Sequence, residues 1–163
     1  MSNIVFQKIA VIGAGTMGSG IAAQIANAGH DVMLFDLPTR DGDNKSPAEQ
    51  AIDRLMVSDP PQLMHKRNAE RITTGTIGDD FDALTDCDWI IEAVVERLDI
   101  KKDLYRRLDA TIGPDCIVSS NTSTIPISLL VEDMPPAFRQ RFAITHYFLS
   151  LIHISEPTRL WTI

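Results

Sequence analysis

A glycine-rich turn between a short apolar run and an Ala-rich helical pattern constrains the fold of this chain more than any other feature. The turn fits the pattern G-x-G-x-x-G and reads Gly13-Ala14-Gly15-Thr16-Met17-Gly18. The apolar run before it, residues 8–12, is typical of a buried parallel strand. Residues 19–28 have the pattern of a helix that ends at Gly29. A second strand over residues 31–36 follows, so this segment predicts a strand–helix–strand unit.

The spacing of the three glycines suits close contact with a phosphate group. Gly13 allows a tight turn, Gly15 lets the backbone approach a pyrophosphate, and Gly18 lets the helix pack against the strand. The helix N-terminus adds free N–H groups and a partial positive charge. Asp36 lies 18 positions after Gly18, near the usual place of the acid that binds an adenosine ribose. A carboxylate there repels a 2′-phosphate and favours NAD. The simpler alternative is a glycine-rich turn beside an ordinary strand-end acid.

Composition narrows the class of protein. The 163 residues suffice for one domain with a core, and 44% hydrophobic with 23% charged residues is typical of a soluble globular chain. A net charge of −7 argues against nucleic acid as the main partner. Cys87 and Cys116 lack the spacing of a metal site and suit a reducing compartment, so we expect a cytoplasmic protein without a metal. We find no signal-peptide pattern and no apolar run of the ~20 residues that a membrane span needs.

Alternating strand and helix patterns continue along the chain. Further strands are predicted over residues 71–74, 88–93, 116–120 and 141–148, and further helices over 46–58, 62–69, 98–112 and 126–131. Ser46 and Glu49 have the spacing of a capping box. We therefore expect a Rossmann-type, doubly wound α/β fold with a mainly parallel sheet of six strands. Ligands of such sheets bind beyond the carboxyl ends of the strands, where we expect the following to meet: Gly13, Asp36, residues 93–96, residues 121–123 and His146.

Three further motifs resemble a known family. They read Glu92-Ala93-Val94-Val95-Glu96, Ser120-Asn121-Thr122-Ser123 and Thr145-His146-Tyr147-Phe148. With the glycine-rich turn, they resemble the NAD-binding domain of the 3-hydroxyacyl-CoA dehydrogenases of fatty-acid β-oxidation, from Lys8 to about Phe148. Residues 61–104 most resemble the long bacterial forms that carry a C-terminal enoyl-CoA hydratase domain. The resemblance implies an oxidoreductase that converts 3-hydroxyacyl-CoA to 3-oxoacyl-CoA, with hydride transfer to NAD, and an intact protein that is a homo-oligomer.

The resemblance also implies roles for single residues. His146 matches the family histidine that removes the hydroxyl proton, a task that suits an imidazole because it titrates near neutrality. Ser123 matches the serine that contacts the nicotinamide and the substrate oxygen. Glu96 and Lys101 match cofactor contacts near the nicotinamide ribose. Considered without the resemblance, these four would be a strand-end histidine satisfied by backbone, a turn-capping hydroxyl, a helix-entry charge and a solvated helix face.

Two charged segments have weaker interpretations. Lys66 and Arg67 lie where the family places basic contacts to the CoA phosphates, although a solvated charge pair is the simpler interpretation. An acidic group between the predicted strands contains no His or Cys, so we interpret it as solvated loop charge rather than a metal site. Its members are Asp79, Asp80, Asp82, Asp86 and Asp88.

The chain departs from the family pattern after the last predicted strand. The family continues with Asn-Pro, where this chain has Leu149-Ser150, and the glutamate that orients the histidine is absent. The helical C-terminal domain of the family is absent as well. Residues 149–159 resemble translated sequencing-adapter DNA. We therefore expect residues 1–148 to form the NAD-binding domain, residues 149–163 to be a non-native or disordered tail, and this fragment to be poorly active alone.

Two other functions fit part of the sequence. A stand-alone NAD-binding or redox-sensing module without catalysis would need a compact fold ending near residue 148 and measurable affinity for NADH. A related 3-hydroxyacid or 6-phosphogluconate-type dehydrogenase shares the glycine motif and the acid, but it relies on a lysine in a later helix. The motifs around Ser123 and His146 argue against that second alternative.

Overall fold

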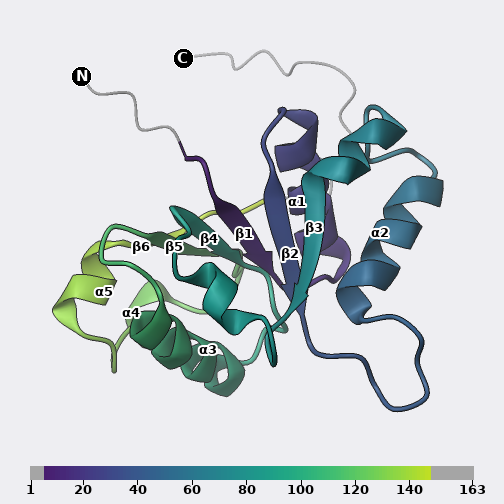
Figure 1. The fold of residues 1–163 in the computed structure, drawn as a ribbon. Helices are drawn as coiled ribbons and strands as arrows, with labels where there is room; N and C mark the ends of the chain where they lie inside the picture. Colours follow the sequence, from purple (N-terminus) through teal and green to yellow (C-terminus); the bar gives the residue numbers. More distant parts are fainter. Residues whose placement is uncertain (1–5, 148–163) are drawn as a thin grey trace, which may run out of the picture.

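Residues 6–147 are described in a computed structural model, in which a six-stranded sheet lies between two layers of helices (Figure 1). The strands are β1 (Ile9–Ile12), β2 (Val32–Asp36), β3 (Ile72–Thr76), β4 (Trp89–Glu92), β5 (Ile117–Ser120) and β6 (Phe142–Ile144). Their order across the sheet is β3-β2-β1-β4-β5-β6, and every neighbouring pair is parallel. The predicted Rossmann-type fold is therefore confirmed. The tail that we expect over residues 149–163 lies outside the described residues.

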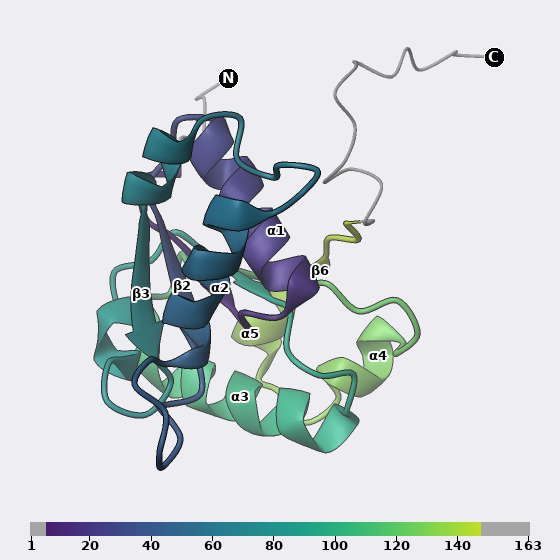
Figure 2. The same cartoon turned by 90° about the vertical axis from the view of Figure 1, so that its right-hand side faces the viewer.

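Helices cover both faces of the sheet. On one face, α1 (Thr16–Asn27) packs beside α2 (Pro47–Val57), as Figure 2 shows. The other face carries α3 (Leu98–Thr111), α4 (Ile127–Leu130) and α5 (Pro136–Gln140). At the start of α2, the Glu49 amide donates to the Ser46 hydroxyl while the Glu49 carboxylate accepts from the Ser46 amide, so the predicted capping box is confirmed.

The side chains of β1 show how strand alternation divides the core. Ile9 and Val11 pack with residues of α1 and α2, whereas Ala10 and Ile12 pack with residues of α3, α4 and α5. All four residues are buried. Because both faces of a doubly wound sheet are covered, a central strand must be apolar at every position, which explains the continuous apolar run seen in the sequence.

Some predicted boundaries are wrong. α1 begins at Thr16 rather than Ser19, because the last residues of the glycine-rich turn are already helical. Of the helix predicted over residues 62–69, only a 3-10 helix, η1 (Lys66–Arg71), forms after the break at Pro60 and Pro61. β6 covers three residues of the predicted strand, whose last residue, Phe148, lies outside the described part. The short elements η2 (Phe81–Leu84) and α5 are absent from the prediction.

The aspartates interpreted as solvated loop charge are partly bound to backbone. The Asp88 carboxylate accepts hydrogen bonds from the amides of Gln7 and Lys8, and Asp80 accepts one from the Thr76 amide. Over residues 6–147, we find no group of three His, Cys, Asp or Glu that could hold a metal ion. Within the same residues, every helix is too short or too polar to cross a membrane.

Candidate functional site

The glycine-rich turn joins β1 to α1 and lies against the end of β4. Gly13 has a φ of 107°, and a Cβ at this position would lie 2.5 Å from the carbonyl oxygen of Ala93. A Cβ at Gly18 would lie 1.7 Å from the carbonyl oxygen of Gly13. Both positions therefore require glycine. The tightest contact at Gly18 is with the turn, not with the strand that the sequence led us to expect.

Gly15 faces open space instead. A Cβ at this position would meet no other atom within 4 Å. Gly15 is also the N-cap of α1, and no side chain within the described part of the chain caps this helix end. The first amides of α1 are thus left for a ligand or water, an arrangement that attracts anions.

A cavity of about 450 Å³ opens beside this turn, at the carboxyl ends of β1, β2 and β4. One side of the cavity is the turn itself. The other side is largely apolar and includes Leu37 and Val95, whose exposed fractions are 50% and 59%. The remaining lining residues include Asp36, Ile77, Val94 and Ile100. A polar turn facing apolar walls suits a ligand that combines phosphates with an aromatic ring.

Asp36 ends β2 and is fixed against the turn. Its Oδ2 accepts a hydrogen bond from the Ala14 amide at 2.5 Å, and its Oδ1 accepts one from the Leu37 amide at 2.7 Å. Each carboxylate oxygen can accept a further hydrogen bond, so the acid can also bind hydroxyl groups in the cavity. Arg54 of α2 supports the same turn by donating to the Ala14 carbonyl at 3.2 Å.

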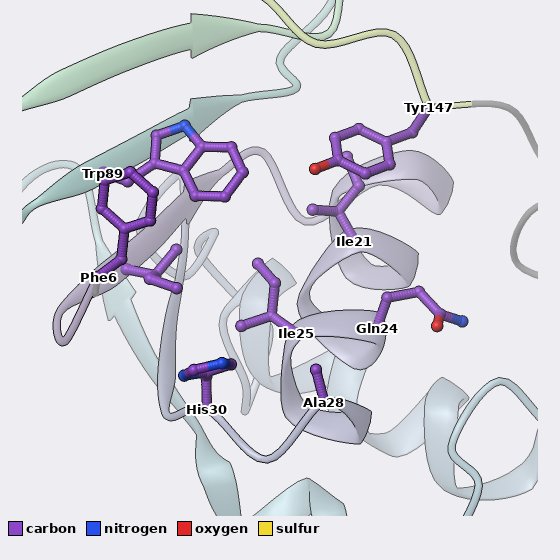
Figure 3. Close-up of a pocket in the computed structure, with 9 residues that line it drawn as sticks. Phe6, Ile21, Gln24, Ile25, Ala28, His30, Trp89 and Tyr147 are labelled. Atoms are coloured by element: carbon purple, nitrogen blue, oxygen red, sulfur yellow. The ribbon is translucent and has the colours of Figure 1, made fainter. Parts of the chain in front are cut away.

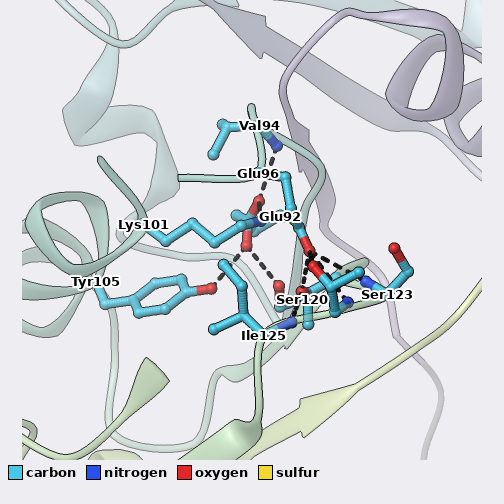
Figure 4. Close-up of polar contacts among 10 residues, drawn as sticks. Glu92, Val94, Glu96, Lys101, Tyr105, Ser120, Ser123 and Ile125 are labelled. Carbon is cyan, nitrogen blue, oxygen red and sulfur yellow. Dashed lines mark hydrogen bonds and ion pairs between the residues drawn. The ribbon is translucent and has the colours of Figure 1, made fainter. Parts of the chain in front are cut away.

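A fully buried acid at the end of β4 organises the region beyond Ala93. The side chain of Glu92 has an exposed fraction of 0%. Its carboxylate accepts four hydrogen bonds (Figure 4). The donors are the Lys101 ammonium at 2.7 Å, the Tyr105 hydroxyl at 2.6 Å, the Ser120 hydroxyl at 2.6 Å and the Val94 amide at 2.8 Å. Burial and the neighbouring carboxylate raise the pKa of Tyr105, so its phenol stays protonated and donates.

Sequence reasoning assigned no role to Glu92. A usable signal was present, because an acid directly follows the apolar run Trp89-Ile90-Ile91 of a predicted buried strand. A carboxylate in that position must be paired or hydrogen-bonded to remain charged. Three of its four partners come from α3 and β5, which the sequence alone does not bring to it.

Lys101 is buried, with an exposed fraction of 1%, so the interpretation as a solvated helix face is wrong. Its ammonium nitrogen lies 2.7 Å from Oε1 of Glu92 and 3.3 Å from Oε2 of Glu96. The lysine therefore bridges a buried acid and a partly exposed one. In this conformation its ammonium group is closed to solvent.

Glu96 binds the turn that follows β5. Its Oε1 accepts from the hydroxyls of Thr122 and Thr124 at 2.5 and 3.0 Å. The same oxygen accepts from the amides of Ser123 and Thr124, both at 3.3 Å. Burial raises the pKa of Glu96, but the threonine hydrogen bonds and the Lys101 charge outweigh burial and lower the pKa to about 2. Glu96 is therefore ionised at neutral pH.

The family described as "3-hydroxyacyl-CoA dehydrogenase, NAD binding domain" matches residues 8–154. The chain belongs to this family. It is 41% identical, over 87% of its length, to a putative fatty acid oxidation complex trifunctional enzyme of Rickettsia felis. It is 40% identical, over the same share, to a probable 3-hydroxyacyl-CoA dehydrogenase of Deinococcus radiodurans. The chain spans 20% and 41% of these two relatives, so it corresponds to only part of each.

The NAD-binding domain also has close structural relatives. The crystal structure of 3-hydroxybutyryl-CoA dehydrogenase from Escherichia coli K12 matches with a TM-score of 0.75 and 31% identity. That match covers 90% of this chain and 30% of the other. The site fits NAD, because open space at Gly15, uncapped amides of α1 and the Asp36 carboxylate meet at one cavity. The predicted cofactor is thus supported by both the family and the geometry.

Two further predicted residues of the NAD-binding domain, Ser123 and His146, lie at the same sheet edge. Ser123 and His146 are exposed and follow β5 and β6. The Asn121 side chain accepts a hydrogen bond from the Tyr147 amide at 2.8 Å, which ties the two strand ends together. Lys66 and Arg67 lie elsewhere, because η1 leads into the amino end of β3. Both side chains are exposed, as the simpler interpretation of a solvated charge pair predicts.

A second cavity of the NAD-binding domain, of about 460 Å³, lies on the flank of α1 (Figure 3). The rings of Phe6 and Trp89 lie at one end of it, with centroids 5.3 Å apart and planes tilted by 40°, and Tyr147 lies at the other. Its lining is mostly apolar and includes none of the predicted site residues. This cavity is therefore separate from the cofactor site.

Proposed function

We propose that the intact protein is an NAD-dependent 3-hydroxyacyl-CoA dehydrogenase and that this chain is its cofactor-binding domain. The reaction is the oxidation of a 3-hydroxyacyl-CoA to the 3-oxoacyl-CoA, and the name of the Rickettsia relative supports fatty-acid oxidation as its setting. One observation carries the proposal. The glycine-rich turn, the Glu96–Ser123 hydrogen bond and the end of β6 all lie at the same edge of the sheet.

Each predicted residue has a task in this proposal. The turn from Gly13 to Gly18 binds the pyrophosphate through the amides of Thr16 and Met17, while the Ala14 amide holds the Asp36 carboxylate against the turn. Asp36 binds the adenosine ribose and disfavours a 2′-phosphate by charge repulsion. Glu96 binds the nicotinamide ribose. Lys101 contributes to that contact through Glu96, since its own ammonium is buried.

The catalytic residues of the proposal are His146 and Ser123. NAD, when bound, supplies the acceptor for the hydride. His146 removes the proton from the substrate hydroxyl as a general base. Ser123 contacts the nicotinamide and the substrate oxygen, and Glu96 fixes its backbone by accepting from its amide at 3.3 Å.

A chimera tests the proposed reaction. Residues 1–148 would be joined to the C-terminal part of the Deinococcus relative, and NADH oxidation would be followed with acetoacetyl-CoA as substrate. We expect turnover, and we expect His146→Ala to reduce kcat at least about a hundredfold while NADH still binds. NADH binding without turnover in the chimera would refute the dehydrogenase and leave a binding module.

We also propose that the intact enzyme is a cytoplasmic homo-oligomer. Cys87 and Cys116 are both free and buried, which suits a reducing compartment. The oligomer follows from the family resemblance alone. Sedimentation of the chimera at several concentrations would measure it, and a monomer at all of them would refute it.

A further inference from the structure

We infer that Glu92 is a positioning residue for the nicotinamide half of the cofactor, acting through Lys101 on Glu96. This role rests on the proposed function, which assigns Glu96 to the nicotinamide ribose. Glu92 cannot touch a cofactor itself, because its side chain is closed to solvent and its carboxylate accepts from four protein groups. Its effect must pass through one of those groups.

Lys101 is the donor that connects Glu92 to the site. Its ammonium lies between Oε1 of Glu92 and Oε2 of Glu96, at 2.7 and 3.3 Å. Glu92 is anchored at the end of a central strand by hydrogen bonds from α3, β5 and the Val94 amide. Lys101 therefore holds Glu96 at a place set by the sheet.

Glu96 lies beside the cofactor cavity, so its position affects how the cofactor binds. Residues 93–95 line the cofactor cavity, and Glu96 follows them directly with a side chain that is 37% exposed. The two oxygens of Glu96 have different partners. Oε2 contacts Lys101, whereas Oε1 accepts from the turn that carries Ser123. The acid thus links the buried ion pair to the residues that we place at the nicotinamide.

Neutralising Glu92 should disturb the contact between Lys101 and Glu96 without affecting the part of the site that binds adenosine. With glutamine at position 92, Lys101 keeps one anionic partner, Glu96. Hydrogen bonds between ionised groups are about twice as strong as neutral ones, so the ammonium would draw Glu96 toward itself and away from the Ser123 turn. None of the four hydrogen bonds of the Glu92 carboxylate reaches Asp36, at the end of β2, or the glycine-rich turn, which follows β1.

The test compares two ligands on the full 163-residue chain. NADH carries both halves of the cofactor, whereas ADP lacks the nicotinamide and its ribose. Calorimetric titration of Glu92→Gln should show an NADH dissociation constant raised about tenfold, with that of ADP changed less than twofold. Asp36→Ala should instead weaken both ligands, and Tyr105→Phe, which keeps both buried charges, should leave the NADH-to-ADP ratio unchanged.

A second variant separates positioning from stability. The double variant Glu92→Gln/Lys101→Met removes both buried charges, so it should fold even if the single variant does not. We expect it to bind ADP normally and NADH about tenfold more weakly. A merely structural role predicts instead that NADH affinity returns with stability. Recovery of NADH affinity in the double variant would overturn the inference. So would an equal loss of affinity for NADH and ADP, or an unchanged NADH affinity, in Glu92→Gln. Failure of the unsubstituted chain to bind either ligand would overturn the proposed function itself.

Discussion

The ammonium nitrogen of Lys101 lies 2.7 Å from the carboxylate of Glu92, and both side chains are closed to solvent. Removing two charges from water is costly, and a buried pair is tolerated only when hydrogen bonds satisfy its remaining atoms. Tyr105, Ser120 and the Val94 amide supply those hydrogen bonds here. Removing the charge of one member of the pair should therefore lower the free energy of unfolding more than removing both charges.

Lys101→Met should lower the free energy of unfolding by about 3–5 kcal/mol, because it leaves Glu92 buried without its counter-charge. The double variant Glu92→Gln/Lys101→Met should recover most of that loss. Urea unfolding followed by circular dichroism measures both. A single variant as stable as the unsubstituted chain would show that the pair is not buried as described.

Gly15 and Gly18 form a matched pair for substitution by alanine. Gly18→Ala should lower the free energy of unfolding by about 3 kcal/mol, because its Cβ would lie 1.7 Å from a carbonyl oxygen. Gly15→Ala should cost less than about 1 kcal/mol, since its Cβ meets no atom within 4 Å. Gly15→Ala should nevertheless weaken NADH binding, because the added methyl group enters the cavity. Thermal unfolding and NADH fluorescence titration measure the two effects, and an inverted order of stabilities would contradict the turn geometry.

Asp36→Ala should weaken NADH binding about tenfold, because a carboxylate that binds hydroxyl groups contributes roughly one to three kcal/mol. The same change should reduce the preference for NADH over NADPH, since it removes a negative charge from the place of the 2′-phosphate. Fluorescence titration with both cofactors gives the two dissociation constants. Unchanged discrimination in the variant would place the adenosine ribose away from β2.

Glu96 should make the free energy of unfolding depend on pH under acidic conditions. Its pKa is about 2 in the folded chain against an ordinary 4.5, so the ionised group stabilises the fold above pH 4.5. That contribution is lost as the pH falls from 4.5 towards 2. Because the side chain is 37% exposed, solvent screening limits the advantage over Glu96→Gln at pH 7 to about 1 kcal/mol. Urea unfolding of both proteins from pH 7 to pH 3 should show this difference shrinking, and a constant difference would contradict the low pKa.

The sequence by itself determined the strand–turn–helix unit, the succession of six strands along the chain and the place of Asp36. These follow from local signals, because a buried parallel strand is apolar throughout and the G-x-G-x-x-G spacing marks the turn between strand and helix. Boundaries were less well predicted where packing decides them, as at η1 (Lys66–Arg71), which overlaps only the end of the helix predicted over residues 62–69.

Only the tertiary structure decided what Glu92 and Lys101 do. In the sequence, Lys101 stands among charged residues of an amphipathic helix, and nothing local shows that it is 1% exposed. Its burial arises because α3 packs over β4 and β5, which brings Lys101 to Glu92. The pairing of β4 with β5 brings Ser120 to the same carboxylate across 28 positions. The sequence shows which residues can carry a charge, whereas the solvent exposure of each depends on which helices and strands cover it.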